Sequence, residues 1–258
     1  MGKIHQSFSI WSNVRGEGVT LEHVLAAAAE IGYAAVDSLG GPPVEELVPL
    51  AAKHGLKVAT FGGHATLTDG LNRPENHERI AGELRASIAK AADLGIPGVI
   101  TFSGNRNGLD DYTGLLNCAE GLKQVAEYAE EKGVNLNMEL LNSKVDHKDY
   151  QCDRTLWGVV LCELVKSPRV KLLYDIYHMQ IDEGDVIRTI ERHHAHFGHY
   201  HTAGVPGRHD LDDDQELNYP AIMRAIVATG YDLYVAHEFL PKGDAIEALR
   251  QAYLRCDV

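Results

Sequence analysis

The sequence predicts an α/β protein, a (β/α)8 TIM barrel in which residues 1–258 form a single domain. Short β-branched or aromatic runs alternate eight times with longer amphipathic stretches rich in Ala, Glu, Leu and Lys, which is typical of parallel β–α units. Eight units in 258 residues give about 32 residues each, and the total matches the ~250 residues of a closed barrel. The nucleotide-binding signatures of open parallel sheets, GxGxxG after the first strand and GxxxxGKS/T, do not occur.

Each unit contributes one strand and one helix. The predicted strands are Ile4–Ile10, Ala35–Leu39, Lys57–Phe61, Gly98–Phe102, Val134–Leu140, Val170–Tyr174, Phe197–His201 and Leu233–Phe239. The predicted helices lie at residues 20–31, 43–54, 75–94, 113–132, 155–166, 185–194, 219–229 and 244–255. The longest loops are expected at Gly62–Pro74, Asn142–Arg154 and Ala203–Asn218.

Helix boundaries support these units. Thr20 is placed to begin the first helix, and Pro220 falls in the first turn of the seventh. Five glycines follow a predicted helix and precede the next strand, where a left-handed backbone ends the helix and glycine has no steric penalty. They are Gly32, Gly55, Gly95, Gly133 and Gly230.

The composition is that of an ordinary globular protein, 45% hydrophobic and 24% charged. A net charge of −13 argues against a nucleic-acid partner, which would need a basic face. The polar N-terminal stretch MGKIHQSFSIW lacks the apolar core of a signal peptide, and no apolar run has the length of a membrane span. We therefore expect a cytoplasmic protein without a membrane partner, in which four scattered cysteines stay reduced.

Polar residues interrupt four successive predicted strands at their carboxyl ends. They are Glu139, Asp175, His201 and Glu238, separated by 36, 26 and 37 residues, each about one β–α unit. A buried acidic residue is costly unless it is paired or bound to metal, and three carboxylates that converge without a cation would repel. The carboxyl ends of barrel strands meet at one mouth, where this fold places its active sites. The sequence therefore predicts a divalent-metal site for Mn²⁺, Mg²⁺ or Co²⁺, with Zn²⁺ left open.

Other residues are weaker candidates for substrate binding. His178 follows Asp175 by three positions and is expected in the loop after the sixth strand. Arg208, in the loop GVPGRHD, either binds an anionic or hydroxyl-bearing ligand or is solvated. His64 follows the third strand and is the third candidate. His199 lies two residues before His201 and so shares its strand face.

Across almost its whole length the chain resembles the hydroxypyruvate isomerase family of the xylose-isomerase-like barrel superfamily. The resemblance is most specific in MELLNSK, LLYDIYHMQ, HYHTAGVPGRHDLDDDQELNYP and AHEFLPKGD. It implies that Glu139 and Glu238 are paired glutamates that both bind the metal and move the proton. It also implies that Asp175 and His201 are the remaining ligands.

The resemblance further matches His178 and Arg208 to positions that contact substrate in related ketose epimerases. The chain departs from the family patterns in two places. Some hydroxypyruvate isomerases carry Gln where this chain has His201. Many 3-epimerases place an extra glutamate shortly after the strand-five ligand, where Val145 and Asp146 stand here.

The resemblance implies an isomerase that interconverts hydroxypyruvate and tartronate semialdehyde through an enediolate, with Glu139 and Glu238 as acid and base. One alternative is a ketose 3-epimerase that uses the same metal and glutamate pair on a larger sugar. Another is a non-catalytic ligand-binding barrel. A metal-dependent nuclease, also found in this superfamily, is disfavoured by the acidic charge. The expected partner is a small hydroxy-carbonyl compound or sugar, and a homo-oligomer remains open.

Overall fold

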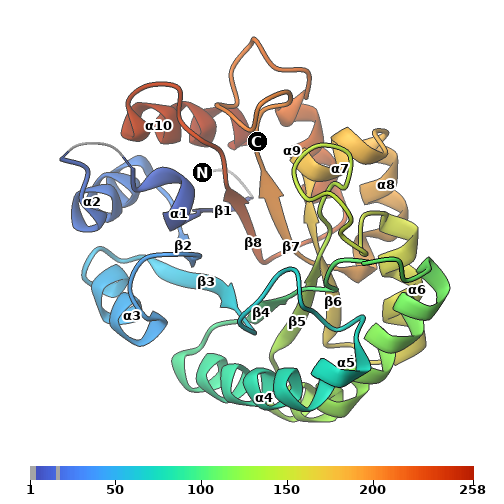
Figure 1. The fold of residues 1–258 in the computed structure, drawn as a ribbon. Coiled ribbons are helices and arrows are strands. Elements are labelled where there is room, and N and C mark those ends of the chain that lie inside the picture. The colour runs from blue at the N-terminus through green and yellow to red at the C-terminus, as the bar shows by residue number, and fades with distance from the viewer. Residues whose placement is uncertain (1–3, 16–17) are drawn as a thin grey trace. The chain divides into compact units, whose positions relative to one another are not determined.

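The computed structural model describes residues 4–15 and 18–258, and Figure 1 shows the path of the chain. The chain divides into two compact units. The first unit comprises Met1–Phe61, Asp185–His194 and His199–Val258, and the second comprises Gly62–Gly184 and Ala195–Gly198. The prediction that residues 1–258 form one domain stays a prediction.

Eight strands occur at the predicted places. They are β1 His5–Phe8, β2 Ala35–Ser38, β3 Lys57–Gly62, β4 Gly98–Thr101, β5 Asn135–Glu139, β6 Val170–Asp175, β7 Phe197–Thr202 and β8 Tyr234–His237. Both faces of most of these strands are buried, as expected of a parallel sheet that is covered by helices.

The helices and 3-10 helices of the described residues follow the same β–α alternation. They are α1 Ile10–Asn13, α2 Leu21–Ile31, α3 Val44–Lys53, η1 Pro74–Asn76, α4 His77–Leu94, α5 Asp111–Lys132, α6 Thr155–Val165, α7 Ile176–Asp182, α8 Val186–His193, η2 His194–His196, α9 Tyr219–Ala228 and α10 Ala245–Cys256. The five predicted glycines all have positive φ, from 70° at Gly95 to 119° at Gly32, so these helix ends are confirmed. The Thr20 hydroxyl accepts a hydrogen bond from the His23 N–H, which confirms the first helix start.

Two short helices were not predicted. The first strand was expected to reach Ile10, but β1 ends at Phe8 and α1 begins at Ile10. The Asn13 side chain donates to the Ser9 carbonyl oxygen over 3.1 Å, which favours a turn there over a further strand residue. His178 was expected in a loop, but it lies in α7, because the Asp175 carboxylate accepts the His178 N–H and caps that helix.

The strands of the first unit are parallel. β8 pairs with β1 and with β7, and β2 pairs with β3. A bridge between Ser9 and Asp37 and a hydrogen bond from the Ala34 N–H to the Gln6 carbonyl oxygen join β1 to β2. The strands of this unit therefore follow one another in the order β3, β2, β1, β8, β7.

This sheet is strongly curved. Asp37 on β2 and His199 on β7 are three strand steps apart, or about 14 Å in a flat sheet at ~4.8 Å a step. Their side chains nevertheless make a hydrogen bond of 2.7 Å. Because the two side chains and the hydrogen bond between them reach less than that span, and would stand perpendicular to a flat sheet, the strands must curl so that their inner faces approach each other, as in a barrel.

The second unit contains the parallel strands β4, β5 and β6, with Gly98 opposite Asn135 and Leu136 opposite Val170. Helices α4 and α5 run side by side along it (Figure 1). All four cysteines are buried free thiols, which confirms the prediction that they form no disulfide. Within the described ranges 4–15 and 18–258, no helix combines the length and apolar character that a membrane crossing needs.

Candidate active site

The four predicted metal ligands lie where the sequence placed them, at the carboxyl ends of four strands. Glu139 ends β5, Asp175 ends β6, His201 is the next-to-last residue of β7, and Glu238 directly follows β8. The Glu238 N–H still donates to the Thr202 carbonyl oxygen, so the ladder continues past the strand end. All four side chains are buried, with exposed fractions of 5, 1, 0 and 3% in chain order.

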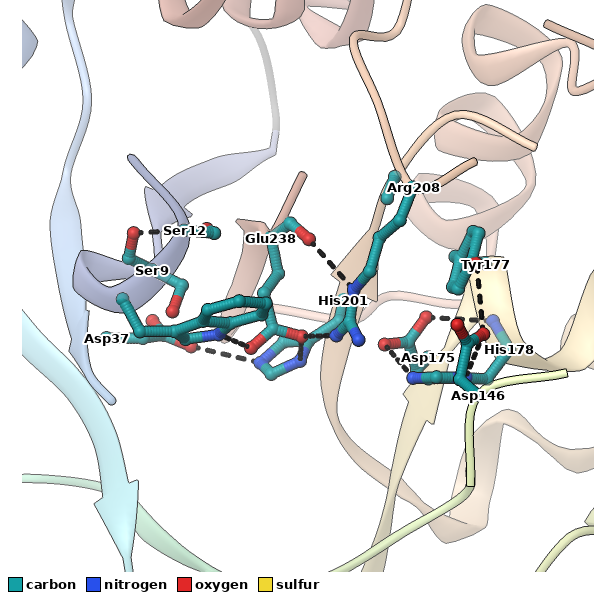
Figure 2. Close-up of polar contacts among 12 residues, drawn as sticks. Ser9, Ser12, Asp37, Asp146, Asp175, Tyr177, His178, His201, Arg208 and Glu238 are labelled. Atoms are coloured by element: carbon teal, nitrogen blue, oxygen red, sulfur yellow. Dashed lines mark hydrogen bonds and ion pairs between the residues drawn. The ribbon is translucent and has the colours of Figure 1, made fainter. Parts of the chain in front are cut away.

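In the first unit, the Glu238 carboxylate accepts hydrogen bonds from two side chains and lies beside the His201 ring (Figure 2). The Trp11 indole N–H donates to Oε1, and Arg208 Nη2 donates to Oε2. His201 Nδ1 lies 3.1 Å from the same Oε2. Burial alone would raise the pKa of Glu238, but His201, Arg208 and these hydrogen bonds hold it far below its usual range. Glu238 is therefore a buried carboxylate that stays ionised.

His201 is held from its other side by Asp37. Asp37 Oδ2 lies 3.2 Å from His201 Nε2 and 2.7 Å from His199 Nε2. The Ser7 hydroxyl donates to Asp37 Oδ1 over 2.7 Å. Burial raises the pKa of Asp37, but the two histidines outweigh it and lower the pKa to about 2. Asp37 is therefore an ionised acceptor between two histidine rings.

These contacts fit a bound cation. Because ionised Asp37 can only accept, His201 carries its proton on Nε2. A ring protonated on both nitrogens donates from Nδ1 to Glu238 Oε2, 3.1 Å away, whereas a ring protonated on Nε2 alone presents a lone pair to that oxygen, which is also an acceptor. Two acceptors at that distance need a proton or a metal ion between them. An imidazole nitrogen and a carboxylate oxygen are ligands that Mn²⁺, Co²⁺ and Zn²⁺ all accept.

The second unit contributes the other two carboxylates. Glu139 and Asp175 end neighbouring parallel strands and offer oxygens within 4.8 Å of each other. The Tyr150 hydroxyl donates to the Glu139 carbonyl oxygen over 3.0 Å and fixes the end of β5. Asp175 Oδ1 accepts the His178 N–H over 3.1 Å at the start of α7, where the helix dipole favours a negative charge.

His178 is fully buried, and its ring has a defined proton position. Its Nδ1 lies 2.6 Å from the amide nitrogen of Asn142, which can only donate. The ring proton of neutral His178 is therefore on Nε2. Asp146 accepts a hydrogen bond from the Tyr177 hydroxyl over 2.9 Å (Figure 2). It also accepts one from the Asn142 amide nitrogen over 2.6 Å. Its carboxylate oxygen lies 3.9 Å from His178 Nδ1.

The other two predicted substrate-binding residues have protein partners. Arg208 donates a hydrogen bond to the Glu238 carboxylate, and its guanidinium lies over the Trp11 ring, 5.1 Å from the ring centre. His64, in the second unit, accepts the Phe102 N–H at Nε2 over 2.8 Å. His64 Nδ1 is buried and has no hydrogen-bond partner among the described residues. The substrate-binding roles of His178, Arg208 and His64 stay predictions.

Two residues of this site were missed by the sequence reasoning. Asp37 carries the signal that identified the other four, an acidic residue within a buried strand, here AVDS. The same rule applied to β2 would have found it. Trp11 gave no comparable signal, because its contact with Glu238 joins residues 227 positions apart.

The family model described as xylose isomerase-like TIM barrel matches residues 25–255. The chain belongs to this family, and the predicted (β/α)8 fold class is confirmed.

Curated relatives bear isomerase names. A 2-oxo-tetronate isomerase of Pectobacterium atrosepticum is 27% identical, covering 86% of this chain and 87% of that protein. A 2-oxo-tetronate isomerase of Cupriavidus necator is 37% identical over 48% of this chain, and the match spans 46% of that protein. A Xenopus laevis protein named "Putative hydroxypyruvate isomerase" is 30% identical over 54% of this chain, which spans 51% of its length. For the last two, the match spans about half the relative.

Solved structures show the same fold at low sequence identity. An AP endonuclease, family 2, from Brucella melitensis superposes with a TM-score of 0.82 at 24% identity, covering 95% of this chain and 97% of that one. An L-ribulose 3-epimerase gives 0.78 at 21% identity, covering 98 and 94%. At this identity the likeness concerns the fold alone.

Proposed function

We propose that this chain is a divalent-metal-dependent isomerase that interconverts the aldose and ketose forms of a small hydroxy-carbonyl compound, with hydroxypyruvate and tartronate semialdehyde as its substrate pair. The observation that carries the proposal is the contact of His201 Nδ1 with Glu238 Oε2, two buried groups that need a proton or a metal ion between them, and two further strands also end in a buried carboxylate. Family membership and the isomerase names of the relatives support the same class of reaction.

The proposed ligands are Glu139, Asp175, His201 and Glu238. Three carboxylates and one imidazole suit Mn²⁺, Mg²⁺ or Co²⁺, and Zn²⁺ is also compatible. When bound, such an ion acts as a Lewis acid that stabilises negative charge on the substrate oxygens.

The chain's own residues move the proton. In hydroxypyruvate a proton must leave the hydroxymethyl carbon and be returned to the ketone carbon, with an enediolate between the two steps, while the hydroxyl proton passes to the former ketone oxygen. Glu139 and Glu238 are the proposed base and acid. We assign His178 the role of donating the proton of Nε2, an atom 3.6 Å from Asp175 Oδ2, to a substrate oxygen, because Asn142 occupies Nδ1. Burial of these groups excludes water, which strengthens their electrostatic effect on the enediolate.

The test is the pair of variants Glu139→Gln and Glu238→Gln, assayed in Mn²⁺ with hydroxypyruvate, tartronate semialdehyde and several ketoses. Each variant should abolish turnover while keeping the circular-dichroism spectrum of the wild type. Glu163→Gln, which alters an exposed glutamate paired with His196, is the matched control and should keep full activity. Retention of more than about a few per cent activity by both site variants would rule out the glutamate pair.

A second candidate function is that of a ketose 3-epimerase, and the position of Asp146 supports it. The extra glutamate of those enzymes is absent, but Asp146, which stands where they carry it, supplies a carboxylate 3.9 Å from His178 Nδ1. Product analysis of the same substrate panel separates the two reactions. Conversion of a ketose to its C3 epimer, with hydroxypyruvate left unchanged, would establish the epimerase.

The non-catalytic alternative predicts no dependence on metal. Chelation followed by addition of Mn²⁺ or Mg²⁺ should raise the melting temperature if the native state binds the ion. Absence of a shift with every divalent ion, together with no turnover on the panel, would support a ligand-binding barrel instead.

A further inference from the structure

Asp37 is a charged residue in the interior of the first unit that the proposed reaction does not use. It lies on β2, is fully buried, and uses both carboxylate oxygens. Oδ1 accepts the Ser7 hydroxyl over 2.7 Å, and Oδ2 faces the Nε2 atoms of His199 and His201. A buried carboxylate is costly without such partners, so this arrangement needs a reason beyond packing.

The two histidines are presented to Asp37 by the geometry of β7. Residues two apart on a strand point to the same face, so His199 and His201 both project inward. Their rings lie 5.1 Å apart at 80°, and the Asp37 oxygen is in reach of both. The shorter contact, 2.7 Å to His199, holds the carboxylate in place, and the contact of 3.2 Å to His201 orients the second ring.

We propose that Asp37 is a positioning residue that keeps the proton of His201 on Nε2 and so reserves Nδ1 for the metal ion. The orientation follows from what each atom can do: Asp37 accepts, His201 Nε2 donates, and Nδ1 is left toward Glu238. A carboxylate behind a ligating histidine also makes the imidazole a stronger ligand. This inference rests on the proposed metal-dependent function.

A different use of the same residues is a metal ion held by Asp37, His199 and His201 themselves. Their ligand atoms lie within 4.8 Å of one another. Such an ion would have to replace the two Nε2 protons, whereas hydrogen bonds from the two Nε2 atoms, 2.7 and 3.2 Å from Asp37 Oδ2, together with the Ser7 hydroxyl, already provide partners for the buried carboxylate. We therefore assign Asp37 to hydrogen bonding, and the experiment distinguishes the two.

The first measurement uses the wild-type protein labelled with ¹⁵N at histidine, with His201→Asn to assign the ring signals. In the metal-free protein, and again with Mg²⁺, the ¹⁵N signal of His201 Nε2 should be that of a protonated ring nitrogen. A wild-type His201 with an unprotonated Nε2 in either state would overturn the proposal. In Mg²⁺, loss of the Nε2 protons of His199 and His201 together would indicate the alternative site.

The second measurement is the affinity of the metal-free protein for Mn²⁺, taken by calorimetric titration. Asp37→Asn keeps the size of the side chain and should weaken binding by about 10- to 100-fold. Ser7→Ala removes only the contact to Oδ1 and is the matched control, expected to change affinity by less than about threefold. Equal affinity in Asp37→Asn and wild type would refute the positioning role.

These outcomes separate this inference from the function on which it rests. If the wild type binds Mn²⁺ and turns over substrate but Asp37→Asn binds equally well, the inference fails and the function stands. If the wild type binds no divalent ion, the function fails, and the proton position on His201 in the metal-free protein still tests what Asp37 does.

Discussion

His64 should make the stability of this protein depend on pH below about 6.5. It is 7% exposed, and burial, the largest influence, lowers its pKa from 6.5 to about 4, with Arg79 acting in the same direction and Glu83 against it. Protonation of Nε2 would also set a donor against the Phe102 N–H that it now accepts. Between about pH 6.5 and pH 4, His64 is therefore protonated in the unfolded chain but neutral in the folded protein.

The sign and size follow from linkage. The unfolded chain binds the proton near pH 6.5 and the folded protein only near pH 4. The contribution of neutral His64 to the unfolding free energy is therefore fully present above about pH 6.5 and is lost as the pH falls toward 4. A shift of about 2.5 units at 1.36 kcal/mol per unit corresponds to about 3 kcal/mol of unfolding free energy.

The assay is urea unfolding of wild type and His64→Gln between pH 7 and pH 4. The Gln amide oxygen can still accept the Phe102 N–H but does not titrate, so the loss of stability should be about 3 kcal/mol smaller in the variant. His23→Gln, at an exposed histidine of α2, is the control and should follow the wild type. Parallel pH profiles for wild type and His64→Gln would refute the reasoning.

Two further predictions concern residues that place the candidate ligands. Tyr150→Phe removes a buried hydroxyl that accepts the Ser103 N–H and donates to the Glu139 carbonyl oxygen, and should lower the unfolding free energy by about 1–3 kcal/mol. An unchanged urea midpoint would contradict this. Asp175→Asn keeps an oxygen for the His178 N–H, so α7 should stay capped and the metal-free melting temperature should not change, while the rise on adding Mn²⁺ should disappear. A full rise in the variant would remove Asp175 from the ligands.

The strands and four of the site residues could be predicted because their signals are local. A buried parallel strand excludes charge, so Glu139, Asp175 and Glu238 stood out within their own short segments. Asp37 carried the same signal on β2 and could have been found by the same rule. The hydrogen-bond partners of Asp37 could not be predicted, because Ser7 and His199 lie 30 and 162 positions from it along the chain.

The two unpredicted helices, α1 and α7, are too short to be recognised from a local sequence pattern. Each is short and begins at once after a strand. Hydrophobic periodicity needs several turns to emerge, and α1 has four residues and α7 seven. The start of α7 depends instead on one side-chain contact, in which the Asp175 carboxylate accepts the His178 N–H. From the sequence, Asp175 was predicted only as a metal ligand.

The sequence by itself determined the β–α order and the four acidic or histidine residues near the carboxyl ends of four strands, because strand burial and helix termination depend on neighbours along the chain. Only the tertiary structure decided how the donors and acceptors around those residues pair. Trp11 and Arg208 reach Glu238 across 227 and 30 positions, and Asp37 reaches His201 across 164. Such pairings arise only when the curved sheet brings distant strands together, and they set the proton position on His201.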